Sequence, residues 1–224
     1  MDSSNRRRIL VGTCTAILAA TLLLNAARVL LNDQPTTPGE IAAVGFLAVL
    51  HVGLTIAAVF GITQLVRRKA DRLGLVGAAL TLLGAVVSAR ILALHQLGML
   101  AETVPGATAT LSTMFQSAPI VWVSIVPIGL MYPIGLILLG TALLIARPVH
   151  RWIAVVLLIG AVLFPIGRAV GVVQAVYASD ALMAIAYGFL SWKILTRREL
   201  WDSSLVTTPE ERREGEYAEA YGVR

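Results

Sequence analysis

Six long apolar stretches constrain this chain more than any other feature. Each is long enough to cross a hydrocarbon core of about 30 Å as a helix that rises about 1.5 Å per residue. Apolar residues make up 57% of the sequence, charged residues make up 14%, and the mean hydropathy is +0.80, which lies outside the range of soluble domains. The sequence therefore predicts an all-α integral membrane protein, a bundle of six transmembrane helices at about 9–31, 41–66, 73–100, 118–146, 151–177 and 179–196.

The chain divides into a membrane domain and a charged tail. Residues 1–198 hold the six apolar stretches, and residues 199–224 are rich in charge and poor in apolar side chains. Near the start, three arginines precede the first stretch in a signal-peptide-like pattern, but that stretch is too long for the apolar part of a signal peptide. We therefore expect a retained first helix and a solvated cytoplasmic tail.

Positive charge is distributed unequally between the two sets of predicted loops. Because lysine and arginine in short loops favour the cytoplasmic side, this asymmetry predicts that both termini are cytoplasmic. The loops on the opposite side carry acidic residues instead, namely Asp33, Glu40, Glu102 and Asp180. The cytoplasmic set of cations is Arg6, Arg7, Arg8, Arg67, Arg68, Lys69, Arg72, Arg147, Arg151, Lys193, Arg197 and Arg198.

The predicted turn between the fourth and fifth helices has a recognisable pattern. Residues 147–152 read RPVHRW and are flanked by two apolar runs. This turn resembles a hairpin in uncharacterised six-helix bacterial inner-membrane proteins, which are grouped only as a domain of unknown function. Those proteins often have a proline where this chain has His150. The resemblance covers about a quarter of the chain. It implies a multi-pass protein of the bacterial cytoplasmic membrane and transfers no catalytic residue.

Several polar side chains are predicted inside the outer half of the bundle, away from the cytoplasmic loops. Arg90 and Arg168 fall near the expected midplane, and His51 reaches a similar depth. An arginine at that depth costs about 2.5–3.5 kcal/mol on insertion scales, so it usually faces a protein interior or a water-filled cavity. The candidate ligand-binding residues are Arg90, Arg168, His51, His95, Asn25, Gln96, Gln174 and Tyr177, and those expected at the outer rim or on lipid phosphate are Arg28, Glu102 and Asp180.

The residue types in this region exclude several chemistries. With Glu102 and Asp180 placed at the rim, no carboxylate is expected deep in the membrane for acid–base work. The single cysteine and three histidines form no metal-ligating or nucleophile pattern, so we predict no catalytic residue and no metal site. The basic residues are not interleaved with aromatic residues on one soluble face, which argues against nucleic acid as a partner.

Our leading hypothesis is a binding or transport protein rather than an enzyme, although the sequence leaves the enzyme question open. Arginine favours carboxylate or phosphate partners, so the pocket suits an anionic or amphipathic small molecule. Three Pro-Ile-Gly triplets, at Pro127, Pro133 and Pro165, predict kinks in the fourth and fifth helices that would help to enclose such a site. The expected partners are membrane lipid and this small ligand, and the oligomeric state is left open.

The sequence is also compatible with three alternatives. The first is a b-type haem protein, in which His51 and His95 on adjacent antiparallel helices ligate one haem and an arginine holds a propionate. The second is an intramembrane enzyme that acts on lipid or isoprenoid. The third is a structural subunit whose arginines pair only with carbonyls and rim carboxylates.

Overall fold

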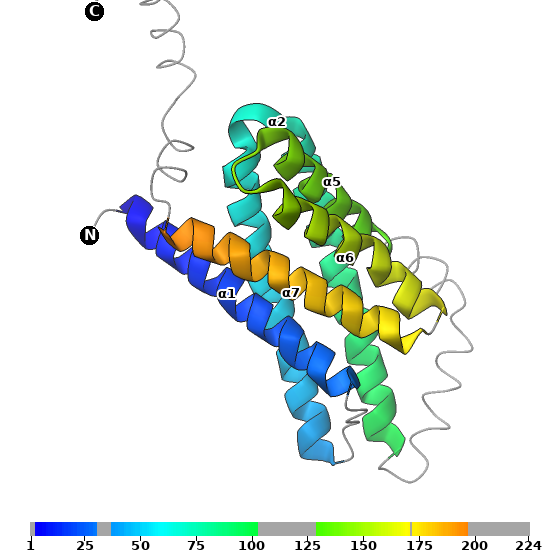
Figure 1. Cartoon of the computed structure of the whole chain (residues 1–224). Coiled ribbons are helices and arrows are strands. Elements are labelled where there is room, and N and C mark those ends of the chain that lie inside the picture. The colour runs from blue at the N-terminus through cyan, green and yellow to red at the C-terminus, as the bar shows by residue number, and fades with distance from the viewer. Residues whose placement is uncertain (1–2, 31–36, 103–128, 171, 197–224) are drawn as a thin grey trace, which may run out of the picture.

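The computed structural model describes residues 3–30, 37–102, 129–170 and 172–196, and nearly all of them are helical. The helices are α1 (Ser3–Leu30), α2 (Pro38–Glu102), α5 (Met131–Ala146), α6 (Arg151–Val170) and α7 (Val173–Thr196). Figure 1 shows them packed into one bundle. The all-α prediction is confirmed for this part of the chain. The count of six helices stays a prediction, because residues 103–128 lie outside the described ranges.

Helix α2 contains two of the predicted helices, which are joined at a sharp bend. Ala70 has a non-helical backbone (φ −142°, ψ 38°), and the two halves of α2 fold back on each other at this point (Figure 1). The bend falls within the polar run 67–72, where cationic side chains prevent the chain from continuing through hydrocarbon. The turn between α5 and α6 lies where the sequence predicts it, because α5 ends at Ala146 and α6 begins at Arg151.

The boundary between the last two helices differs from the prediction. Helix α6 ends at Val170 and α7 begins at Val173, whereas the prediction was a fifth helix that ends at 177 and a sixth that begins at 179. Residues 178–180, which were predicted to form a loop, therefore lie about two turns inside α7. Of the prolines expected to kink helices, Pro133 lies in the first turn of α5, where its missing N–H removes no intrahelical bond, and Pro165 lies inside α6.

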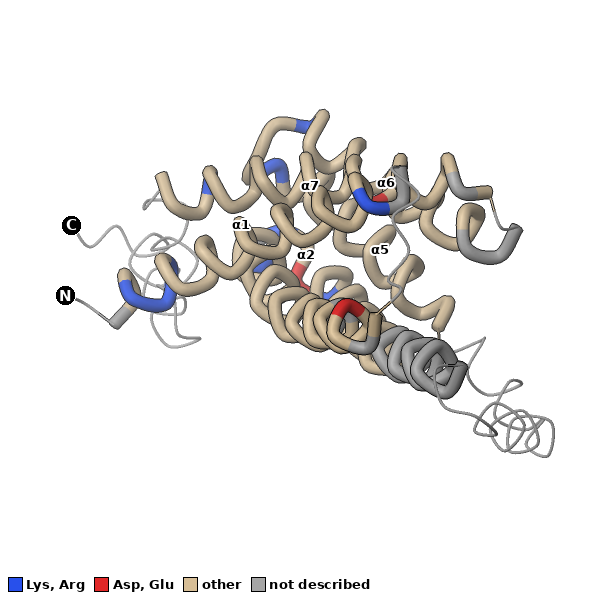
Figure 2. Tube along the Cα trace, turned by 90° about the horizontal axis from the view of Figure 1, so that it is seen from below, with Lys and Arg blue, Asp and Glu red and all other residues tan. Residues whose placement is uncertain are grey.

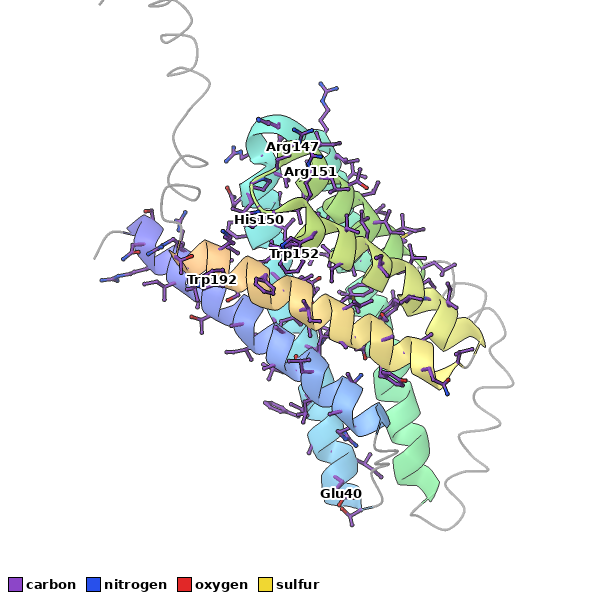
Figure 3. All side chains as sticks on the ribbon, in the orientation of Figure 1. Glu40, Arg147, His150, Arg151, Trp152 and Trp192 are labelled. Atoms are coloured by element: carbon purple, nitrogen blue, oxygen red, sulfur yellow. The ribbon has the colours of Figure 1, made fainter. Side chains whose placement is uncertain are left out.

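The helices contact one another in a closed cycle. α1 packs on α7, α7 on α6, α6 on α5, α5 on α2 and α2 on α1. The N-terminal end of α1, the bend of α2, the α5–α6 turn and the C-terminal end of α7 lie toward one end of the bundle, which we call the basic end (Figure 1). The other end of the bundle, which includes Glu40 (Figure 3), is called the opposite end.

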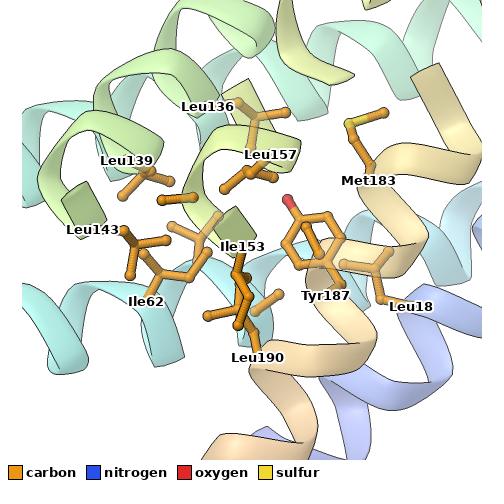
Figure 4. Packing of buried hydrophobic residues seen from close by; sticks show 14 of the residues in the cluster. Leu18, Ile62, Leu136, Leu139, Leu143, Ile153, Leu157, Met183, Tyr187 and Leu190 are labelled. Carbon is orange, nitrogen blue, oxygen red and sulfur yellow. The ribbon is translucent and has the colours of Figure 1, made fainter. Parts of the chain in front are cut away.

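The largest buried side chains meet where all five helices converge. Figure 4 shows Leu18 of α1, Ile62 of α2 and Tyr187 of α7 against leucines of α5 and α6. Lipid tails are as apolar as leucine, so association of such helices depends on close packing and hydrogen bonds more than on exclusion of water. The tightest approach is between α2 and α5, where a Cβ atom added to Gly84 would collide with the backbone of Tyr132.

The outer surface of the bundle is apolar, as expected for a protein that faces lipid. Large hydrophobic side chains are exposed all along it, with Leu10, Phe46 and Leu75 each more than 60% accessible. Figure 2 shows few charged positions on the described helices. Three helical stretches, Ser4–Arg28, Gly39–Arg67 and Lys69–Val87, are long and apolar enough to cross a membrane, and two apolar helices are shorter. The architecture is that of a helical membrane protein.

Candidate functional site

A polar contact joins α1 to α7 near the opposite end of the bundle. The side-chain amide of Asn25 donates a hydrogen bond of 2.5 Å from Nδ2 to Oδ2 of Asp180. Only 1% of Asp180 is accessible, and it lies seven residues after the first residue of α7, or about 10 Å along the axis. Asp180 was expected in a loop at the outer rim, but it lies inside α7, because that helix begins earlier than predicted.

The neighbouring residue of α7 makes a second contact at the same level. Ser179 is buried, and its hydroxyl donates to the carbonyl oxygen of Gly160 in α6 at 2.9 Å. Consecutive residues of a helix point about 100° apart, so Ser179 can face α6 while Asp180 faces α1. One turn of α7 is thereby hydrogen-bonded to both of its neighbours.

Small residues recur along α1 and α7, which pack on each other. Ala26 of α1 is buried beside Asn25, and farther along the same pair of helices a Cβ atom added to Gly188 would meet Ala19. Toward the basic end, the hydroxyl of Ser191 donates to the carbonyl oxygen of Gly12 at 2.7 Å. Small side chains let the two backbones approach, so polar atoms at several levels come within hydrogen-bonding distance.

Arg28 lies on α1 one turn beyond Asn25, in the last turn of the helix, and is half-buried. Residues three apart on a helix are surface neighbours, so Arg28 lies on the same side of α1 as Asn25. A cation in the last turn also interacts favourably with the negative end of the helix dipole. The opposite end therefore combines a carboxylate, an amide and a guanidinium group within two adjacent helices.

The remaining candidate residues within the described part occupy different surroundings. Gln174 is exposed near the start of α7, and Tyr177, one turn later, is half-buried. His51 is half-buried in the first half of α2, and its carbonyl oxygen accepts a hydrogen bond of 2.8 Å from the buried hydroxyl of Thr55. Gln174 and Tyr177 thus lie on the same helix as Asp180, whereas His51 lies on α2.

The side chains of five candidates lie outside the described part of the structure, although their backbone is helical. Of these, the second half of α2 carries all but Arg168, which is near the end of α6. The five are Arg90, His95, Gln96, Glu102 and Arg168. Their assembly into one pocket with His51 therefore stays a prediction. Within the described ranges, no group of three His, Cys, Asp or Glu side chains is arranged to hold a metal ion.

Comparison of the chain with protein-family models, curated proteins and solved structures finds no match. The resemblance of residues 147–152 to six-helix bacterial membrane proteins thus stays a prediction.

Sequence reasoning missed the buried Asp180 and the two serine contacts of α7. Gly171, which falls between the end of α6 and the start of α7, was the available signal for the boundary. Placing the turn there would have put Asp180 inside a helix of 24 residues. The serine contacts had no such signal, because serine is common in membrane helices with or without a partner in a neighbouring helix.

Proposed function

We propose that this chain is a membrane binding or transport protein whose ligand has an anionic head and an apolar body. The site lies in the half of the bundle away from the basic end and includes Arg90 and Arg168 as the anion contacts. The observation that supports this most is the buried Asp180, which accepts a hydrogen bond from Asn25 in that half. Ionisable groups inside a membrane domain are costly and are usually kept for function.

The buried Asp180 gives the proposed site an acidic group in addition to its basic ones. Three arginines, Arg28, Arg90 and Arg168, belong to this half of the bundle, and Asp180 brings a carboxyl group to the same half. We expect this carboxyl group to compete with an anionic ligand for the arginines. An anionic ligand can bind and leave reversibly, which is what a carrier or a sensor requires.

A direct test uses the full chain, purified in a neutral detergent, with dodecyl phosphate and laurate as probes. Their affinities are measured from the shift of the thermal unfolding midpoint, and dodecanol serves as a neutral probe of the same chain length. We expect Arg90→Gln and Arg168→Gln each to weaken binding of the anions at least tenfold, because a hydrogen bond to a charged group contributes about 1.5–3 kcal/mol. Arg147→Gln, which removes an exposed arginine from the basic end, is the matched control and should bind normally.

Two results would overturn the proposal. One is dodecanol binding as tightly as the two anions, which would show that the head group is not recognised. The other is unchanged affinity in both arginine variants while their unfolding midpoints remain normal. The second result would favour a structural subunit, in which the polar contacts only hold the helices together.

The haem hypothesis has a separate test. His51 and His95 belong to the two halves of α2, which fold back on each other as antiparallel segments. If these two histidines ligate haem, the protein expressed with haem supplied should show a Soret band, and both His51→Ala and His95→Ala should lose it. Absence of a Soret band in the unsubstituted protein would eliminate this alternative.

A further inference from the structure

Three aromatic side chains form an exposed cluster near the basic end, and we call Trp152, Phe189 and Trp192 the aromatic cluster. The rings of Trp152 and Phe189 meet edge to face with centroids 4.5 Å apart, and the rings of Phe189 and Trp192 are 6.3 Å apart. The three side chains are 41%, 39% and 56% accessible, so the cluster is on the outer surface of α6 and α7. It is not part of the buried core.

Cations lie directly beside this cluster. The Nζ atom of Lys193 is 5.5 Å from the centroid of the Trp192 ring, which is within the range of a cation–π interaction. Arg151 precedes Trp152 and is exposed. In Figure 3, Arg147 and Arg151 lie above Trp152 and Trp192, close to the α5–α6 turn at the basic end.

Exposed and half-buried side chains follow the same order along both helices. On α6, Arg151 and Trp152 are followed on the outer surface by the aliphatic residues Val155, Ile159 and Val162, spaced three or four apart. On α7, reading from the basic end inward, Lys193 and Trp192 are followed by Phe189 and then Ile185. On both of these adjacent antiparallel helices, the order from the basic end inward is therefore a charged residue, then aromatic residues, then aliphatic residues.

This order reproduces the layers of one leaflet of a bilayer. Aliphatic side chains contact acyl chains, tryptophan prefers the level of the glycerol and head groups, and lysine and arginine reach the phosphates. We propose that the aromatic cluster, together with Arg151 and Lys193, is a binding surface for the head group of an anionic phospholipid. It sets the depth of the bundle at the basic end and is separate from the ligand site proposed above.

The test combines depth measurement with lipid preference, using the full chain in vesicles. The sequence has four tryptophans, so Trp122→Phe and Trp201→Phe leave Trp152 and Trp192 as the fluorescent reporters. Phosphatidylcholine and phosphatidylglycerol are used, brominated either near the head group or near the end of the acyl chain. We expect stronger quenching by the shallow bromine and stronger quenching by phosphatidylglycerol than by phosphatidylcholine.

Charge removal separates specific recognition from general attraction. Arg151→Gln combined with Lys193→Gln should lower the preference for phosphatidylglycerol about fivefold for each charge removed. Lys69→Gln combined with Arg72→Gln removes the same charge from exposed positions at the bend of α2 and should leave the preference at these tryptophans nearly unchanged. Equal losses in the two double variants would overturn the proposal. The proposal would also be overturned if the bromine near the end of the acyl chain quenched most strongly. The same holds if iodide added to the water quenched the tryptophans while neither brominated lipid did.

Discussion

Asn25 and Asp180 lie 155 positions apart in the chain and are joined by a hydrogen bond from the amide of α1 to the carboxylate of α7. The two helices run antiparallel, so the contacts between them at the basic end involve Arg8 and Gly12 of α1 with Leu195 and Ser191 of α7. Arg8 Nη1 donates to the carbonyl oxygen of Leu195, one of the carbonyls that the end of a helix leaves without an intrahelical partner. The first and last described helices are thus hydrogen-bonded near both ends of their contact.

Removing the amide of Asn25 should destabilise the protein, because Asp180 is buried and would lose a donor. We expect Asn25→Ala to lower the free energy of unfolding by about 1–3 kcal/mol. The measurement is unfolding by a denaturing detergent titrated into the purified protein, followed by far-ultraviolet circular dichroism. Gln174→Ala, which removes an exposed amide from α7, is the control and should change stability little. Equal effects of the two substitutions would contradict the importance of the Asn25–Asp180 contact.

The hydrogen bonds of Ser179 and Ser191 should contribute less to the free energy of unfolding than the hydrogen bond to Asp180. Hydrogen bonds between membrane helices average about 0.6 kcal/mol and rarely exceed about 1.7 kcal/mol. Ser179→Ala and Ser191→Ala should each destabilise the protein within that range in the same detergent titration. Thr196→Ala also removes a hydroxyl, but that hydroxyl bonds to the carbonyl of Trp192 within its own helix. A loss of stability in Thr196→Ala as large as in the serine variants would show that contact between helices is not the cause.

Features that depend on the incompatibility of charge with hydrocarbon could be predicted from the sequence. The bend of α2 falls in the run 67–72 because several cations together cannot be placed among lipid tails. The turn before Arg151 contains Pro148, which lies between α5 and α6. Both features are encoded locally, so composition was sufficient to find them.

Features that depend on a partner in another helix could not be predicted in the same way. Asp180 is polar, and a polar residue between two apolar runs is interpreted as part of a loop unless its partner is known. Its partner, Asn25, is on the first helix. Gly171 could have placed Asp180 inside a helix, but a single sequence gives no measure of which distant helices are adjacent, so the contact with α1 that buries Asp180 could not be predicted.

The close approach of α2 and α5 predicts a strong effect of side-chain size at one glycine. A Cβ atom at Gly84 would collide with the backbone of Tyr132, and backbone cannot move aside as a flexible side chain can. We expect Gly84→Ala to cost about 3 kcal/mol, at the upper end of the usual cost of overpacking. Gly53→Ala is the matched control, because no atom lies within 4 Å of its added Cβ atom and alanine favours a helix over glycine. Both variants are compared by their detergent unfolding midpoints, and equal midpoints would contradict the tight α2–α5 contact.

The orientation predicted from the charges can be tested by labelling cysteines in intact cells. In a Cys14→Ser background, Gly39→Cys should react with a membrane-impermeant maleimide, because residue 39 is exposed at the opposite end of the bundle, expected to face outward. His150→Cys, at an exposed position of the α5–α6 turn at the basic end, should react only after the cells are permeabilised. The expectation follows from the concentration of lysine and arginine at that end. The reverse labelling pattern would show that the basic end faces outward, and the proposed ligand site would then open toward the cytoplasm.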